Sequence, residues 1–127
     1  MTTWHYCVVG RPVSGTNSQQ IVKVGKRRLV LKSKAQREWR ADAVAQLTDQ
    51  RKHRAAIAAP CAVTLHIYRQ RNQGDVDNYA KGVLDALQDA GILEDDKHVT
   101  ELHLYRHTDP ARPRVEIAIA LRGTEDA

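Results

Sequence analysis

The feature that most constrains the fold is a strict alternation of apolar and polar side chains in two segments. From Cys61 to Arg69, Cys, Val, Leu and Ile alternate with Ala, Thr, His and Tyr, and Val, Ile and Leu occupy every second position from 115 to 121. Successive side chains of a strand point to opposite faces, so both segments predict strands with one strongly apolar face. Two such strands indicate a sheet that is buried on one side.

In two other segments, apolar residues recur with the period of an α-helix. Such helices can form the second layer that covers the apolar face of the sheet. Apolar residues recur at helical spacing from Ala35 to Leu47, which predicts a helix from about 34 to 55. The opposite face of this helix is interpreted as solvated and carries Arg37, Arg40, Asp42, Gln46 and Asp49. A second helical pattern begins at Ala80 and ends at Gly91, a residue typical of a helix C-terminus.

The remaining segments complete an α/β fold of the α+β kind. Short β-branched or aromatic runs predict strands at 4–9, 21–24, 28–31 and 99–105, of which the middle two form a hairpin. A chain of 127 residues has room for one core, so we expect a single domain over 1–122, with a mixed sheet, two main helices and a frayed tail at 123–127. Because Phe is absent, the core must rest on aliphatic residues, Trp4 and Trp39, with Cys7 and Cys61 as small core residues.

The charge of the chain makes nucleic acid a candidate partner. A formal net charge of +5 attracts polyanions, although many basic proteins bind no nucleic acid. The two cysteines do not form a CxxC pair, which argues against a zinc site or a disulfide framework. No signal segment and no run of transmembrane length is found, so a reduced cytoplasmic setting without a membrane partner is expected. Within this basic chain, acidic residues gather at Asp75, Asp77, Asp85, Asp89, Glu94, Asp95 and Asp96.

Asp75 and Asp77 lie between a predicted strand and a predicted helix. If the backbone between them is extended, both carboxylates point to the same side, where two anions repel each other unless a cation lies between them. Carboxylate oxygens suit Mg²⁺, which completes its shell with water and substrate phosphate. The competing interpretation is that Asp77 or Asn78 only caps the helix.

Lys81 and Asp96 extend this candidate site. Lys81 follows Asp77 by one helical turn, where its ammonium group could stabilise charge on a phosphate or form no more than a surface ion pair. Asp96 belongs to an acidic turn before the strand predicted to start near Val99. We expect the helix to pack back on the sheet so that this turn comes close to Asp75 and Asp77 and supplies a third carboxylate.

A longer string of residues around this site is specific where the DxD pair alone is weak. It comprises Asp75-Val76-Asp77-Asn78-Tyr79-x-Lys81, then Asp85-Ala86-Leu87, then Gly91-Ile92 with Asp95-Asp96 and Val99. In order and spacing it resembles the signature of the RusA-type Holliday junction resolvases, also called crossover junction endodeoxyribonucleases. The similarity covers most of the chain, including the strands on either side.

The resemblance implies that the metal-binding acids of the family fall on Asp75, Asp77 and Asp96 and its catalytic lysine on Lys81, with Mg²⁺ as the cofactor and Mn²⁺ as a substitute. It also implies a homodimer that binds a four-way DNA junction and nicks two strands of like polarity symmetrically during recombination and repair. DNA contacts are expected at Ser14, Asn17, Arg69, Arg71, Asn72 and Asn78. The family's run of arginines before the motif is reduced here to Arg69 and Arg71.

The expected reaction is therefore metal-dependent hydrolysis of a phosphodiester. One alternative is a related nuclease that cuts other branched DNA in phage genome processing. The other is a non-catalytic nucleic-acid-binding module in which the acids only cap helices and stay solvated. Metal titration against binding and cleavage separates the catalytic interpretations from the last one.

Overall fold

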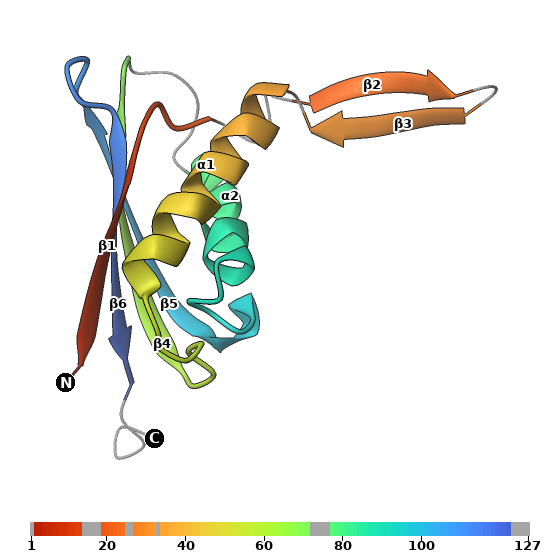
Figure 1. Ribbon diagram of the computed structural model, residues 1–127. Coiled ribbons are helices and arrows are strands. Elements are labelled where there is room, and N and C mark those ends of the chain that lie inside the picture. Colours follow the sequence, from red (N-terminus) through yellow and green to blue (C-terminus); the bar gives the residue numbers. More distant parts are fainter. Residues whose placement is uncertain (1, 14–18, 25–26, 33, 72–76, 123–127) are drawn as a thin grey trace.

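The computed structural model describes residues 2–13, 19–24, 27–32, 34–71 and 77–122 (Figure 1). Its main sheet has four strands in the order β1, β6, β4, β5. Their bounds are β1 Thr3–Val9, β4 Cys61–Arg69, β5 Val99–Thr108 and β6 Arg114–Leu121. β6 is antiparallel to both of its neighbours, whereas β4 and β5 are parallel. The predicted single domain with a mixed sheet and two helices is confirmed.

Both helices pack on the same face of this sheet (Figure 1). They are α1, Lys34–Arg51, and α2, Asp77–Asp89. Alternate residues of β4 are fully buried on this face and form the centre of the core, at Cys61, Val63, Leu65 and Ile67. The period-two pattern therefore predicted this face correctly. Trp39 is buried against it, whereas Trp4 is only partly buried.

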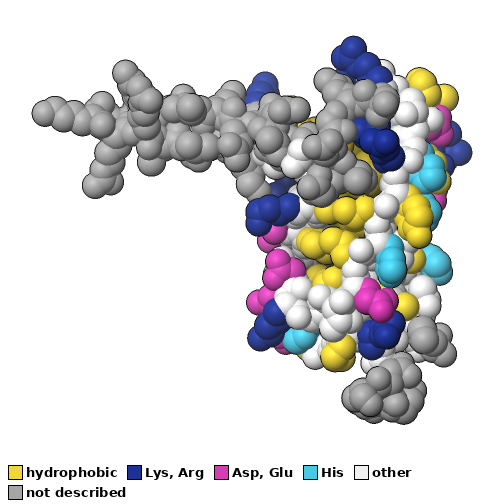
Figure 2. Space-filling model, turned by 180° about the vertical axis from the view of Figure 1, so that it is seen from behind, with side chains coloured by type: hydrophobic (Ala, Val, Ile, Leu, Met, Phe, Trp, Pro, Cys, Tyr) yellow, Lys and Arg dark blue, Asp and Glu magenta, His cyan; other side chains and the backbone are white. Residues whose placement is uncertain are grey.

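The opposite face of the sheet is not covered by any described helix. Residues there are half-buried or exposed along all four strands. Histidine side chains lie along this side of the molecule (cyan in Figure 2). No helix of the described part of the chain is long and apolar enough to cross a membrane.

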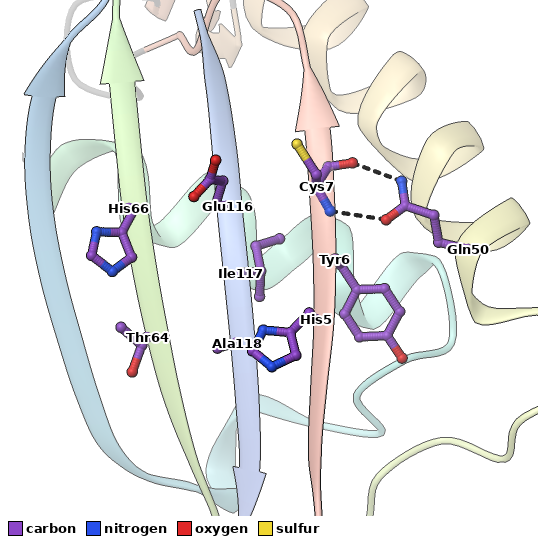
Figure 3. Close-up of a pocket in the computed structure, with 9 residues that line it drawn as sticks. All are labelled: His5, Tyr6, Cys7, Gln50, Thr64, His66, Glu116, Ile117 and Ala118. Atoms are coloured by element: carbon purple, nitrogen blue, oxygen red, sulfur yellow. Dashed lines mark hydrogen bonds between the residues drawn. The ribbon is translucent and has the colours of Figure 1, made fainter.

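Two glutamines of α1 hydrogen-bond to the outer edge of β1. Gln50 accepts from the Cys7 amide at 2.8 Å and donates to its carbonyl at 2.6 Å (Figure 3). Gln46 repeats this pair of bonds with the backbone of Val9, at 2.8 and 2.9 Å. Each amide thus replaces a neighbouring strand and protects an edge that is otherwise open to pairing.

The expectation that one face of α1 is only solvated is wrong for two of its residues. Gln46 contacts β1, and Arg40 bridges to α2, with its Nη2 2.6 Å from the Asp89 carboxylate and its Nη1 3.8 Å from that of Asp85. Charged and amide side chains at these positions connect neighbouring elements. A helical period alone does not distinguish such contacts from solvation.

The predicted hairpin is present as strands β2, Gln19–Val24, and β3, Arg27–Lys32, which pair antiparallel and form a separate sheet. It extends away from the main sheet next to the start of α1 (Figure 1). Element ends differ slightly from the predicted ones. α1 stops at Arg51 because Lys52 adopts a positive φ of 59°, and α2 is followed by Gly91 with a φ of 75°, as expected for a helix end.

Candidate active site

The candidate site is built around the carboxyl end of β4 and the start of α2. β4 ends at Arg69 and α2 begins at Asp77, which is therefore the first helical residue. Asn78 is half-buried, and Lys81 is exposed one turn further along the helix. Asp77 and Lys81 thus lie on neighbouring positions of one helix surface, as the sequence predicted.

Several predicted site residues lie outside the described residues, namely Asp75, Asn72, Ser14 and Asn17. The tail at 123–127 lies outside them as well. Of the expected DNA-contacting residues, Arg71 is exposed, whereas Arg69 is only 3% exposed. The guanidinium of Arg69 lies 5.9 Å from the ring centroid of Tyr79, so this arginine contacts the first turn of α2.

Asp96 lies at the other end of α2. It begins a short 3-10 helix, η2, Asp96–His98, which leads directly into β5. The Asp96 amide donates to the Gln88 Oε1 at 3.2 Å, near the C-terminus of α2. At 1.5 Å per residue, the span of helix from Asp77 to Gln88 is about 16 Å.

The expected approach of Asp96 to Asp77 is therefore not found within one chain. β4 and β5 are parallel, so α2 returns the chain from the carboxyl end of β4 to the amino end of β5. A turn placed before β5 consequently lies at the opposite end of the sheet from a loop placed after β4. Among the described residues, no three His, Cys, Asp or Glu side chains come close enough together to hold a metal ion.

Asp95, the neighbour of Asp96, has a structural role. Its carboxylate accepts from the Lys97 amide at 2.9 Å and caps η2. This backbone hydrogen bond is the main reason why the pKa of Asp95 is lowered from its ordinary value. A carboxylate that already caps a helix is a less suitable metal ligand than its neighbour.

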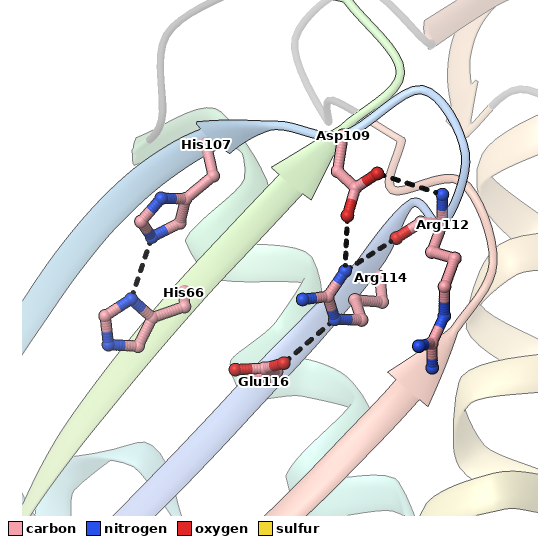
Figure 4. Close-up of polar contacts among 6 residues, drawn as sticks. All are labelled: His66, His107, Asp109, Arg112, Arg114 and Glu116. Carbon is pink, nitrogen blue, oxygen red and sulfur yellow. Dashed lines mark hydrogen bonds and ion pairs between the residues drawn. The ribbon is translucent and has the colours of Figure 1, made fainter.

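A row of stacked rings on the uncovered face was not predicted. His66 Nδ1 lies 2.9 Å from His107 Nε2, and the two rings stack with a centroid separation of 5.1 Å (Figure 4). Tyr105 stacks on His66, and Tyr68 stacks on His107. The Arg114 guanidinium covers Tyr68 at 3.7 Å and bonds to the carboxylates of Asp109 and Glu116. Only the strand register, which pairs His66 with Tyr105 and Tyr68 with His107, could have revealed this row.

Sequence reasoning also missed three residues at the carboxyl end of β5. Arg106, His107 and Thr108 line a cavity of about 210 Å³ together with Arg69. Arg69 was predicted from its position before the acidic motif, whereas the other three lie almost forty positions along the chain. Their only sequence signal is the pairing of Arg69 with Thr108 that a parallel β4 and β5 impose.

The chain is thus a small basic α+β protein. Its candidate site lies where the carboxyl ends of the parallel strands β4 and β5 meet the N-terminus of α2. A family model described as endodeoxyribonuclease RusA matches residues 10–120, which is most of the chain. The protein therefore belongs to the RusA family of endodeoxyribonucleases, nucleases that act on Holliday junction DNA. No curated protein sequence matches the chain.

Proposed function

We propose that the protein is a Mg²⁺-dependent endonuclease that resolves Holliday junctions by paired, symmetric nicks. Family membership supports the nuclease activity and the junction substrate. The positions of Asp77 and Lys81 on the first two turns of α2 support the assignment of the reaction to this end of the sheet. Asp75, Asp77 and Asp96 are the proposed metal-binding residues, and Lys81 is the proposed catalytic lysine.

The donor set fits Mg²⁺ in its chemistry, because carboxylate oxygens are the ligands that this hard cation prefers and Mn²⁺ accepts as well. When bound, the cation would polarise the phosphodiester and lower the pKa of a water molecule. Lys81, exposed beside Asp77, donates to the phosphoryl oxygens and stabilises the charge that develops there. Arg71, also exposed, neutralises a backbone phosphate.

The location of Asp96 is the observation that carries the proposal of a homodimer. Asp77 and Asp96 lie near opposite ends of α2, so one chain does not bring all three acids together. A second copy that runs antiparallel to the first would place its own Asp96 at the Asp77 end. Two such centres, related by a two-fold axis, would also cut two strands symmetrically.

The outer edge of β5 is the surface that we propose for this second copy. Among the described strands β5 pairs only with β4, and two of its side chains, Leu102 and Tyr105, are 40% and 49% exposed although they are large and hydrophobic. An unpaired edge of ten residues is a template for another strand. No described residue covers it as Gln46 and Gln50 cover the edge of β1.

Pairing of two β5 strands about a two-fold axis is antiparallel, so the amino end of one strand lies beside the carboxyl end of the other. The partner subunit's Asp96 precedes β5 directly, and it would therefore approach the end of the sheet where β4 stops and α2 begins. At the usual strand spacing, the partner's β5 would lie about 10 Å from β4. The proposed centre is then shared between two copies.

Cleavage of synthetic DNA tests the proposed reaction. Wild-type protein is expected to nick a mobile four-way junction in Mg²⁺ at symmetric positions, and to cut forks and linear duplex far more slowly. Asp77→Asn should abolish nicking while junction binding is kept, because the charge is lost and the shape is retained. Asp95→Asn is the matched control and should still cleave, since Asn also caps helices.

Full cleavage by Asp77→Asn in Mg²⁺ would refute the proposed metal centre. Faster cutting of forks than of four-way junctions would instead favour a nuclease for other branched DNA. Metal-independent binding without any cleavage would favour a non-catalytic binding module.

A further inference from the structure

A cavity of about 210 Å³ lies where β4 and β5 end, and no role in the proposed metal centre accounts for it. It is lined by Arg69, Arg106, His107 and Thr108. Arg69 pairs with Thr108 in the strand register, so the cavity spans the carboxyl ends of two adjacent parallel strands. Ligands of α/β proteins commonly bind at such ends, close to the start of the following helix.

We propose that this cavity binds one phosphate of the DNA backbone, next to the phosphate that is hydrolysed. The proposal rests on the proposed function and names a substrate contact for it. Two guanidinium groups and a hydroxyl line the cavity, and both of these group types donate hydrogen bonds to phosphate oxygens. A guanidinium is a cation whose planar fork of donors matches the oxygens of a phosphate.

The burial of Arg69 makes the cavity a prepared site. Its side chain is 3% exposed and contacts the Tyr79 ring, so its guanidinium is held in place before DNA arrives. A donor that is fixed in advance loses little conformational entropy on binding. Partial exclusion of water also strengthens its attraction to an anion.

Arg106 supplies the accessible charge of the same cavity. Its side chain is exposed, and no described acidic residue forms an ion pair with it. Asp109, the acidic residue nearest in sequence, is instead held by the Arg114 guanidinium at 2.9 Å and by the Arg112 amide at 3.2 Å (Figure 4). The Asp109 carboxylate is therefore engaged by Arg114 and the Arg112 amide rather than by Arg106.

His107 completes the lining of the cavity, and its ring lies beside Tyr68 on the uncovered face of the sheet. Its ring stacks on Tyr68 at 4.4 Å and contacts His66, both on β4, and Arg114 of β6 lies above Tyr68, so side chains of two other strands set its orientation. The row of rings on the uncovered face thus holds the segment of β5 on which Arg106 and Thr108 flank His107. The cavity is close to α2, because Tyr79, two residues after Asp77, touches Arg69. A DNA strand that enters the acidic centre would present its next phosphate here.

The test is a comparison of Arg106→Gln with Lys52→Gln, both measured in the Asp77→Asn background so that no cleavage occurs. Both substitutions remove one exposed positive charge, but Lys52 lies beyond the C-terminus of α1, at the opposite end of the sheet. Binding of a labelled four-way junction is measured over a series of salt concentrations. Arg106→Gln should reduce the slope of log K against log salt by about 0.9, the value of one phosphate contact on duplex DNA, whereas Lys52→Gln should leave it unchanged.

Neutral methylphosphonate linkages locate the phosphate. Substituted one at a time around the nick site, they should weaken binding at one position neighbouring the scissile phosphate, and Arg106→Gln should remove that sensitivity. Equal salt slopes for the two variants, or an unchanged methylphosphonate profile in Arg106→Gln, would overturn the proposal. These binding measurements do not depend on catalysis. A wild-type protein that never cleaves would refute the proposed function, whereas the phosphate cavity would still be tested by the salt slopes and the methylphosphonate profile.

Discussion

Replacing Gln50 by Met should destabilise the protein by about 1–3 kcal/mol. The side-chain amide makes two hydrogen bonds with the backbone of Cys7, at 2.8 and 2.6 Å, in a half-buried position. A net 0.5–1.5 kcal/mol for each bond gives roughly that sum. Met keeps the length of the side chain and its packing, so the loss reports the polar contacts. Gln46→Met removes two similar bonds to Val9 and an exposed one to Asp42, all at a more exposed position, and should cost less.

Urea unfolding followed by the fluorescence of buried Trp39 measures both changes. Asp49→Asn, an exposed substitution on the same helix, is the control and should change the free energy of unfolding by less than about 0.5 kcal/mol. If Gln50→Met is as mild as Asp49→Asn, the edge of β1 does not depend on these amides and the reasoning fails.

Two further predictions concern the thiols and the edge of β5. Burial raises the pKa of both thiols, and Cys61 is fully buried whereas Cys7 is half-buried. At pH 8, iodoacetamide should therefore label Cys7 slowly and Cys61 only after unfolding, as measured by mass spectrometry. Equal labelling of the two thiols in the native protein would contradict the described burial. Leu102→Lys places a charge on the exposed edge strand β5 and should shift the protein from dimer to monomer in sedimentation velocity. Lys52→Gln is the control and should leave the dimer intact. A dimer that survives Leu102→Lys would argue against β5 as the interface.

The strands and helices of the main domain could be predicted from local patterns because each buries one regular face. Period two identified Cys61–Arg69 with the bounds that β4 has, and the helical period identified both helices. The ends of the elements were predicted less accurately. α1 ends at Arg51 because Lys52 adopts a positive φ, and a periodic pattern of apolar residues carries no information on that angle. The polar contacts of Gln46 and Arg40 were missed because a pattern of apolar residues gives no information on where amides and charges bind.

Local spacing predicted how Asp77 and Lys81 lie relative to each other on α2, but not where Asp96 lies. Asp77 and Lys81 lie on one helix surface, as local spacing required. Asp96 was expected beside them, yet the parallel pairing of β4 and β5 places it at the far end of α2. That pairing is a long-range property, as is the cavity that joins Arg69 to Arg106. Local spacing predicts contacts between residues one helical turn apart, whereas contacts between β4 and β5 depend on a strand pairing that the local pattern does not contain.

Mixed dimers of two inactive variants test most directly whether the acidic centre is shared between copies. Asp77→Asn and Asp96→Asn should each fail to nick a four-way junction alone. In a co-expressed mixture, each heterodimer combines the intact Asp75 and Asp77 of one chain with the intact Asp96 of the other, so nicking should return to about a quarter of the wild-type rate, with one strand cut per junction. If native mass spectrometry shows the heterodimers and no nicking returns, Asp96 does not act across the dimer and the proposed centre is wrong.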